Sequence, residues 1–415
     1  MRVVLFAGKG GVGKTTLAAA TGASLSAAGR KTLVVSTDPA HSLSDALDVR
    51  LGGEPAEVDD GLFAAEPDTR ALLGGAWSTL RGHLSTLLAG AGVDEVVAEE
   101  LTVLPGFEEL LALSEVQRMA RTGPWETVLV DCAPTAEAMR LLALPEVCAG
   151  YLERVFPTHR RMVRGMLSGF AGPSSSAQRW DATADALSRL AEYLESLRAL
   201  VTDPVATSVR LVLTPERVVA AETRRSVTAL ALQGIRVDGL LANRLVPAVA
   251  QRARGPAADW LRTRRREQDE VLAALRADLP GVPVRAVEHR AAEPVGLGPL
   301  RELAADLGGP DPGDADAADE LLAEGARPAP MMAVSHVGGA GLDSEYQLRL
   351  TLPLVQADSV QLARVDDDLA VTAAGHRRLV ALPSVLKRCT VIGAEVDDDG
   401  IVVRFRPDPA VWMRR

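Results

Sequence analysis

A glycine-rich segment near the amino terminus constrains this chain more than any other feature. Residues 8–15 read Gly-Lys-Gly-Gly-Val-Gly-Lys-Thr and match the pattern GxxxxGK[ST]. The apolar run from Met1 to Ala7 predicts a buried strand before the loop, and the alanine- and leucine-rich run from Lys14 to Ala28 predicts a helix after it. A strand, a glycine loop and a helix in this order favour a phosphate-binding P-loop.

Each residue type in this loop suits a triphosphate. Glycines let backbone amides turn inward around phosphate oxygens, and the start of the helix adds its positive end. Lys14 is expected to neutralise the β and γ oxygens, and the Thr15 hydroxyl is expected to bind Mg²⁺. The predicted contacts to the cofactor ATP are Gly8, Gly10, Gly11, Val12, Gly13, Lys14, Thr15 and Thr16.

Further apolar runs predict a mostly parallel α/β sheet. Short runs at 33–35 and 128–130 are apolar throughout, as strands covered by helices on both faces are, and further strands are expected at 209–213 and 239–242. Polar residues follow these runs directly, among them Asp38, Asp131 and Asn243. In an open α/β sheet the ligand crevice lies at the carboxyl ends of the strands, so we expect the site there.

Two aspartates at these strand ends are candidates for the metal site. Asp131 ends the run 128–130 and is expected to hold Mg²⁺ through a water molecule; it also suits a helix cap for the segment near Ala136. Asp38 is placed to orient the attacking water and to contact Mg²⁺ through water. Spacing alone leaves a second use open, in which Asp38 or Ser42 caps a helix at 43–47.

The chain divides into three parts. Residues 1–307 are expected to form the nucleotide-binding domain, with an inserted helical subdomain at about 66–125 and 150–203 where leucines recur at helical spacing. Residues 308–343 are rich in Gly, Pro, Ala and Asp and are expected to be a linker. Residues 344–415 alternate apolar and polar side chains and predict a small all-β sandwich.

Composition limits the partners and the compartment. The formal net charge of −10 disfavours nucleic acid, and no apolar run is long enough to cross a bilayer, so we expect a cytoplasmic protein with at most peripheral membrane contact. Cys132, Cys148 and Cys389 form no CxxC pair, which indicates neither disulfides nor a zinc site. Cys148 is interpreted as a buried structural cysteine.

Three segments together resemble one family. The Gly8–Thr16 loop with its extra Lys9, the run Asp38-Pro39-Ala40-His41-Ser42 and the run Asp131-Cys132-Ala133-Pro134-Thr135 are similar to the deviant-Walker P-loop ATPases of the ArsA family. That family includes arsenite-pump ATPases and the ATPase that delivers tail-anchored membrane proteins. The resemblance covers roughly residues 1–305, and it implies an ATP-hydrolysing enzyme that uses Mg²⁺.

The resemblance also implies roles for single residues. Lys9 would reach the nucleotide of a facing protomer, which implies a homodimer, and Asp38 would activate water. Asp131–Thr135 would form the second switch. Asn243 would contact adenine, and Pro294, in the run Glu293–Leu297, would belong to a loop that closes over the base.

The carboxy-terminal unit, 345–407, resembles the α-crystallin-like domain found in some members of this family, which suggests protein handling; a passive module is the alternative. The leading hypothesis is therefore a dimeric ATPase that binds hydrophobic polypeptide or membrane-protein clients. The alternatives are the energising ATPase of an arsenite or oxyanion exporter and a nucleotide-gated holdase acting through the β domain.

Four surface or core features have simpler expected uses. The run of arginines within 262–266 is interpreted as a solvated helix face, with a membrane-surface or client contact as the alternative, and the acidic runs 366–368 and 397–399 are interpreted as hairpin turns. Met119, Met162 and Met166 either line an apolar groove for clients or belong to a core.

Overall fold

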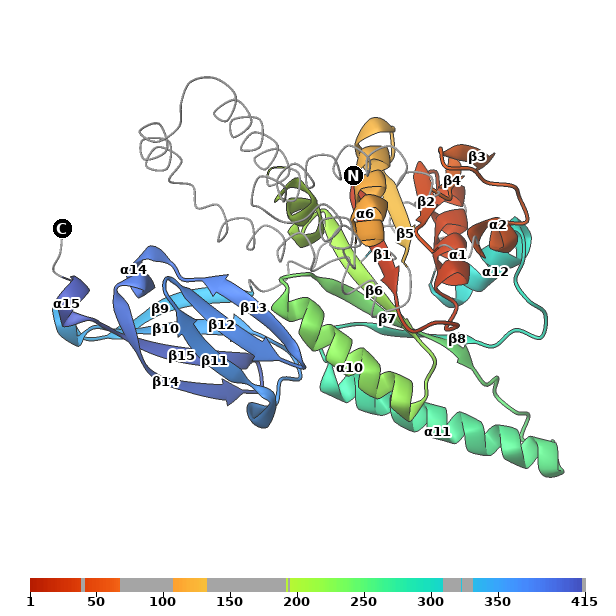
Figure 1. Cartoon of the computed structure of the whole chain (residues 1–415). Helices are drawn as coiled ribbons and strands as arrows, with labels where there is room; N and C mark the ends of the chain where they lie inside the picture. Colours follow the sequence, from red (N-terminus) through yellow and green to blue (C-terminus); the bar gives the residue numbers. More distant parts are fainter. Residues whose placement is uncertain are drawn as a thin grey trace, which may run out of the picture.

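An eight-stranded sheet forms the centre of the larger domain in a computed structural model of the chain (Figure 1). The structure describes residues 1–38, 42–67, 107–132, 195–308 and 331–412, together with the single residues 192 and 322. The strand order is β3-β4-β2-β5-β1-β6-β7-β8, and all neighbours run parallel except the antiparallel pair β3–β4. The predicted mostly parallel α/β core is confirmed.

Helices cover both faces of this sheet. The strands are β1 (Arg2–Ala7), β2 (Thr32–Ser36), β3 (Ala56–Asp59), β4 (Leu62–Ala65), β5 (Thr127–Asp131), β6 (Thr207–Leu213), β7 (Val237–Leu245) and β8 (Val284–Glu288). The helices are α1 (Lys14–Ala27), α2 (Ser42–Leu47), α6 (Phe107–Thr122), α10 (Arg217–Leu232), α11 (Pro256–Asp278) and α12 (Leu297–Asp306).

Alternate residues of the same strands serve two separate cores. Val3 and Leu5 of β1 pack with α6, α10 and α11, whereas Val4 and Phe6 pack with α1, α2 and α12. Because both faces are covered, the central strands are apolar at nearly every position, as their sequences indicated. The strands therefore hold the loops at their carboxyl ends in fixed positions.

The helical regions of the sequence lie only partly among the described residues. Within the stretch 66–125, α6 packs directly on the sheet through Leu113, Val116 and Met119. Within the stretch 150–203, residues 195–202 are helical and add Leu197 to the same core. The remainder of the expected subdomain, with Met162, Met166 and Cys148, lies outside the described residues.

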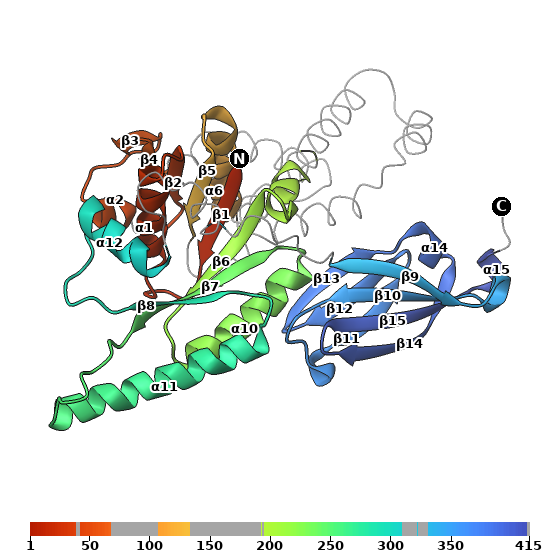
Figure 2. The same ribbon diagram turned by 180° about the vertical axis from the view of Figure 1, so that it is seen from behind.

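The carboxy-terminal domain is a sandwich of two antiparallel sheets (Figure 2). One has the order β14-β15-β10-β9 and the other β11-β12-β13. The elements are β9 (Met332–Gly338), η2 (Gly341–Asp343), β10 (Glu345–Thr351), η3 (Ala357–Ser359), β11 (Gln361–Val365), β12 (Asp368–Ala373), β13 (His376–Ala381), α14 (Ser384–Lys387), β14 (Cys389–Asp397), β15 (Gly400–Pro407) and α15 (Pro409–Trp412).

The sheet of this sandwich begins earlier than the sequence indicated. β9 lies inside the stretch 308–343 that was assigned to the linker, and it pairs antiparallel with β10 over most of its length. The error has a physical reason, since β9 is an edge strand with mostly exposed side chains and carries no apolar alternation. The β domain therefore includes residues from Met332 onward.

The β domain is attached to one helix of the larger domain. Leu232, the last residue of α10, is buried in the core of the β sandwich. Its carbonyl accepts a hydrogen bond of 2.6 Å from Nη1 of Arg378 on β13, and the Thr228 hydroxyl donates to the Pro353 carbonyl at 2.8 Å. α10 thus belongs to both domains.

Candidate nucleotide and magnesium site

The P-loop lies between β1 and α1, and two of its glycines have no substitute. A Cβ on Gly8 would lie 2.1 Å from the Val212 carbonyl oxygen, because β6 passes directly behind the loop. Gly13 has a φ of 95°, and a Cβ there would lie 2.3 Å from Nδ2 of Asn243. The loop is therefore held tightly against β6 and β7.

Asp131 joins the P-loop to the neighbouring strand. Its Oδ2 accepts hydrogen bonds from the Thr15 hydroxyl at 2.7 Å and from the Ser36 hydroxyl at 3.0 Å. β5 lies between β1 and β2, so the carboxyl end of β5 brings these two hydroxyls together. The second predicted use of Asp131, a cap for a helix near Ala136, concerns residues outside the described part of the chain.

The electrostatics of Asp131 suit a bound cation. The side chain is fully buried, and burial raises the pKa of its carboxyl to about 6. Hydrogen bonds from Thr15 and Ser36 and the charge of Lys14 lower this pKa in part, while the nearby Asp38 carboxylate raises it. The Oδ1 atom is buried without a hydrogen-bond partner, so the residues present fit a magnesium-bound water at that oxygen.

Asp38 lies at the mouth of the crevice. It follows β2, is half-buried, and its backbone amide donates to the Ser36 hydroxyl at 3.3 Å. The Thr37 amide donates to the Asp131 carbonyl at 2.8 Å, which ties the start of this loop to β5. Residues 39–41 of the same loop lie outside the described residues.

The cap of α2 differs from both sequence candidates. The amides of Leu43 and Ser44 donate to Oε1 of Glu66 at 2.9 and 3.0 Å, so Glu66 supplies the acceptor that was expected from Asp38 or Ser42. Ser42 instead places its hydroxyl 2.9 Å from the Thr15 hydroxyl. No pattern in the sequence pointed to Glu66, because it lies 22 and 23 residues from its partners.

Asn243 contacts the P-loop from β7. Its Nδ2 donates to the Val12 carbonyl at 2.8 Å, and its Oδ1 accepts from the amide of Arg244 at 2.9 Å. The pairing of β7 with β8 is irregular here, and Arg244 adopts a left-handed φ of 59°. Gln268 on α11, which the sequence did not single out, accepts from the Val246 amide at 2.7 Å and supports this irregularity.

The predicted base loop leads into α12. Pro294 is half-buried, and Gly296 precedes the helix with a φ of 81°. The Gly296 amide donates to the Ala46 carbonyl of α2 at 2.9 Å. This loop is therefore tied to α2, the helix that also carries Ser42.

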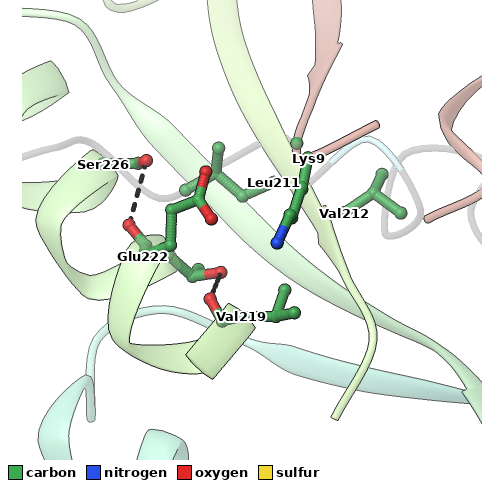
Figure 3. A pocket seen from close by; sticks show the side chains of 8 residues that line it. Lys9, Leu211, Val212, Val219, Glu222 and Ser226 are labelled. Atoms are coloured by element: carbon green, nitrogen blue, oxygen red, sulfur yellow. Dashed lines mark hydrogen bonds between the residues drawn. The ribbon is translucent and has the colours of Figure 1, made fainter. Parts of the chain in front are cut away.

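Lys9 extends from the outer rim of the P-loop. The residue is exposed and lines a small hollow with Leu211, Val212 and part of α10, as Figure 3 shows. Glu222 and Val219 of α10 form the facing wall. The Lys9 side chain enters this hollow on the side of the P-loop that faces α10 (Figure 3).

Several other sequence expectations are now decided. Met119 is buried in the core and lines no groove. The acidic runs form the turns β11–β12 and β14–β15, and among the described residues no cluster of His, Cys, Asp or Glu is arranged to hold a metal ion. The arginines of α11 form ion pairs on an exposed face, for example Arg265 with Asp269 and Glu288.

A Walker-type loop, a hydroxyl-bound strand-end carboxylate and a mostly parallel sheet define a P-loop nucleotide-binding protein. Comparison with known proteins specifies the class further. The family model described as anion-transporting ATPase matches residues 1–309, and the model described as HSP20-like domain found in ArsA matches residues 343–405. This chain belongs to the ArsA family of ATPases and carries its HSP20-like domain.

Two of the following three relatives match nearly the whole chain, and the third matches a little more than half of it. "Protein Rv2184c" of Mycobacterium tuberculosis is 40% identical over 99% of this chain and 97% of its own length. "Putative arsenical pump-driving ATPase" of Prosthecochloris vibrioformis is 32% identical over 92% of this chain and 90% of its own length. "ATPase get3" of Neurospora crassa is 30% identical over 59% of this chain and 74% of its own length.

Among the described helices, none combines the length and the apolar character that a membrane span requires.

Proposed function

We propose that this chain binds ATP with Mg²⁺ and hydrolyses it as a cytoplasmic homodimer, whose nucleotide state controls the binding of hydrophobic protein clients. The observation that carries the catalytic part is the contact of the Thr15 hydroxyl with the buried Asp131 carboxylate, 2.7 Å apart and beside Lys14. A magnesium ion bound by that hydroxyl would have a water-bridging carboxylate directly behind it.

The roles of the side chains follow from their places in the crevice. Lys14 and the amides of residues 8–16 bind the phosphates, and Mg²⁺, when bound, neutralises charge that develops on the β and γ oxygens. Thr15 would hold the metal through its hydroxyl, and Asp131 would hold it through a water molecule. Asp38, half-buried at the end of β2, orients the water that attacks the terminal phosphate and accepts its proton.

Two features support a homodimer. The chain contains a single P-loop, and its Lys9 is exposed at the rim of that loop, where its side chain lines the hollow beside α10. An ammonium in that place is available to a nucleotide on a facing copy, as the resemblance to the ArsA family implies.

The β domain supports a protein client. The edge strands of its four-stranded sheet, β9 and β14, expose Val334, Val337, Val391 and Ile392, which are between 37% and 59% accessible. Exposed apolar residues on unpaired strand edges suit extended hydrophobic segments. The same observation favours the holdase alternative, in which the β domain alone binds the client and hydrolysis acts as a timer.

An exporter ATPase is the second candidate, favoured by the name of the Prosthecochloris relative. A soft arsenite centre needs neighbouring thiolates. Cys132 and Cys389 are free and buried in the cores of different domains, and burial raises the pKa of both thiols. These two cysteines therefore do not form an arsenite site. If arsenite stimulates ATP turnover, the exporter proposal is favoured, and residues other than these two cysteines must bind the arsenite.

The decisive experiment measures nucleotide binding by calorimetry and phosphate release with the full chain. Lys14→Ala is expected to lower ATP affinity by roughly 100-fold or more, because a buried charge partner of the phosphates is lost. Asp38→Asn is expected to bind ATP normally and to lose most turnover. Lys387→Ala, an exposed lysine of the β domain, is the matched control.

Wild-type protein that binds no ATP would refute the proposal, and equal turnover of wild type and Asp38→Asn would remove Asp38 from its role. The client part is tested by binding of Asp38→Asn with ATP to a labelled peptide of about 20 apolar residues. Removal of residues 331–415 should leave hydrolysis intact. If the shortened protein hydrolyses ATP but no longer binds the peptide, the holdase alternative is favoured. If neither the full chain nor the shortened protein binds the peptide, the proposal of a hydrophobic protein client is refuted.

A further inference from the structure

A buried carboxylate outside the predicted site holds the start of α2. Glu66 is only 6% exposed. Its Oε1 accepts the amides of Leu43 and Ser44, and its Oε2 accepts the Ser44 hydroxyl at 2.5 Å. Three hydrogen bonds therefore converge on one charged group at the first turn of a six-residue helix.

So short a helix depends on contacts of this kind. A single turn and a half is not stable by itself, and the amides of its first turn lack partners within the helix. A carboxylate at that end satisfies the amides and interacts favourably with the helix dipole. The position of α2 is thus set by Glu66 at its start and by the Gly296 amide at the Ala46 carbonyl near its end.

Glu66 is itself fixed by the sheet. It directly follows β4, whose Ala65 is paired with Val35 of β2 in parallel register. The Glu66 amide donates to the Gly52 carbonyl at 2.8 Å. Since β2 ends at Ser36, which binds Asp131, the carboxylate of Glu66 is held in the same rigid frame as the magnesium site.

Helix α2 connects Glu66 to the hydroxyl of Thr15, the proposed metal-binding group. Ser42, the first residue of α2, lies one residue before Leu43, and its Oγ is 2.9 Å from Oγ1 of Thr15. Thr15 is also the residue that donates to Asp131. A continuous series of hydrogen bonds and one helical turn therefore joins Glu66 to the Thr15 hydroxyl.

We propose that Glu66 is a positioning residue for ATP hydrolysis, which fixes Ser42 of α2 against the metal-binding hydroxyl of Thr15. The inference rests on the proposed hydrolysis of ATP with Mg²⁺. Glu66 touches neither nucleotide nor metal, so its removal leaves the phosphate-binding amides and Lys14 intact. It changes the rate of the chemical step and the Mg²⁺ requirement more than ATP affinity.

The first test compares steady-state hydrolysis by the full chain carrying Glu66→Gln with wild type. The amide keeps the shape and one acceptor but loses the charge, and we expect kcat to fall about tenfold while KM for ATP changes by less than about threefold. The Mg²⁺ concentration for half-maximal rate should rise. Glu57→Gln on β3, an exposed glutamate in the neighbouring strand, is the matched control and should behave as wild type.

A second, milder variant keeps the test informative if Glu66→Gln does not fold. Ser44→Ala removes the hydroxyl that donates to Glu66 and accepts from the Leu51 amide, and it keeps both backbone bonds to Glu66, so a loss of about two- to fourfold in kcat is expected. A purely structural cap would lower the melting temperature of either variant without changing kcat or the Mg²⁺ dependence of the folded protein. Wild-type kcat and Mg²⁺ dependence in the folded variants would overturn the proposal.

A double-mutant cycle tests whether the effect passes through Ser42. Ser42→Ala removes the group that contacts Thr15, so adding Glu66→Gln to it should lower kcat by less than about twofold further. Full additivity of the two losses would overturn the inference. If wild type hydrolyses no ATP, the proposed function and this inference fail together. If wild type hydrolyses ATP and Glu66→Gln has the same kcat and Mg²⁺ dependence as wild type, the inference about Glu66 alone is refuted.

Discussion

At the scale of single residues, Asp131 has the most constrained environment in the site. It is completely buried, it accepts two hydroxyl hydrogen bonds on Oδ2, and its Oδ1 has no partner. Such a carboxylate is unfavourable when ionised unless a cation is near. The ionised Asp131 carboxylate is therefore unfavourable in the metal-free protein, and the Mg²⁺ ion of the proposed function would offset that cost.

The pH dependence of stability follows from the raised pKa of Asp131. The folded value is about 6 and the ordinary value is 3.8, so the unfolded chain releases this proton first as the pH rises. The contribution of Asp131 to the free energy of unfolding is fully present below about pH 4 and is lost as the pH rises through about 6. The free energy of unfolding changes by about 3 kcal/mol at most for this reason. The test measures the melting temperatures of wild type and Asp131→Asn without metal at several pH values. Between pH 4.5 and pH 7 the melting temperature of Asp131→Asn should rise relative to that of wild type. A difference independent of pH would contradict the assignment.

At the scale of elements, α10 connects the two domains. Its side faces Lys9, and its last turn enters the core of the β sandwich. Arg378 binds the Leu232 carbonyl at 2.6 Å and also contacts the Met331 sulfur. A cation at a helix carboxyl end is favourable there, because the last carbonyls lack partners within the helix.

Arg378→Ala is expected to weaken the contact between α10 and the β domain by about 1–3 kcal/mol of interaction free energy, because a charge-assisted hydrogen bond is lost at a half-buried site. Hydrogen exchange should accelerate in the last turn of α10 and in β13, while ATP turnover stays near wild type. Arg377→Ala, the exposed neighbour on β13, provides the comparison. Unchanged exchange in Arg378→Ala would show that apolar packing around Leu232 alone fixes the domains.

The elements also show what the sequence was able to predict. β1, α1, β2 and β5 were found because strands covered on both faces are apolar at every position, and Asp38 and Asp131 were found because they follow such strands. The exposed strands β3 and β9 lack that pattern and were missed, and β4 was missed although all four of its residues are apolar, because it is so short. Glu66 and Gln268 were missed for another reason: their importance comes from partners that folding alone brings near.

At the scale of the whole molecule, the site is expected to be complete only in a dimer. Lys9 is exposed on the side of the P-loop that faces α10, and it lines a hollow with Glu222. The proposal that it reaches the nucleotide of a second copy predicts that ATP strengthens association.

Lys9→Ala should weaken association in the presence of a non-hydrolysable ATP analogue by about tenfold or more, since a charge-assisted contact across the interface is lost. Sedimentation equilibrium with and without the analogue measures this directly. Lys31→Ala, at the opposite end of β2 from the crevice, is expected to associate as wild type does. Equal dimerisation of Lys9→Ala and wild type would exclude the lysine from the interface.

The attachment of the β sandwich to α10 has a consequence for how such a dimer would hold its cargo. Because the helix beside Lys9 also enters the sandwich core, pairing two copies through the Lys9 face would set the spacing between two sandwiches. A polypeptide with two apolar stretches at that spacing would then bind with avidity, whereas one with a single stretch would leave quickly.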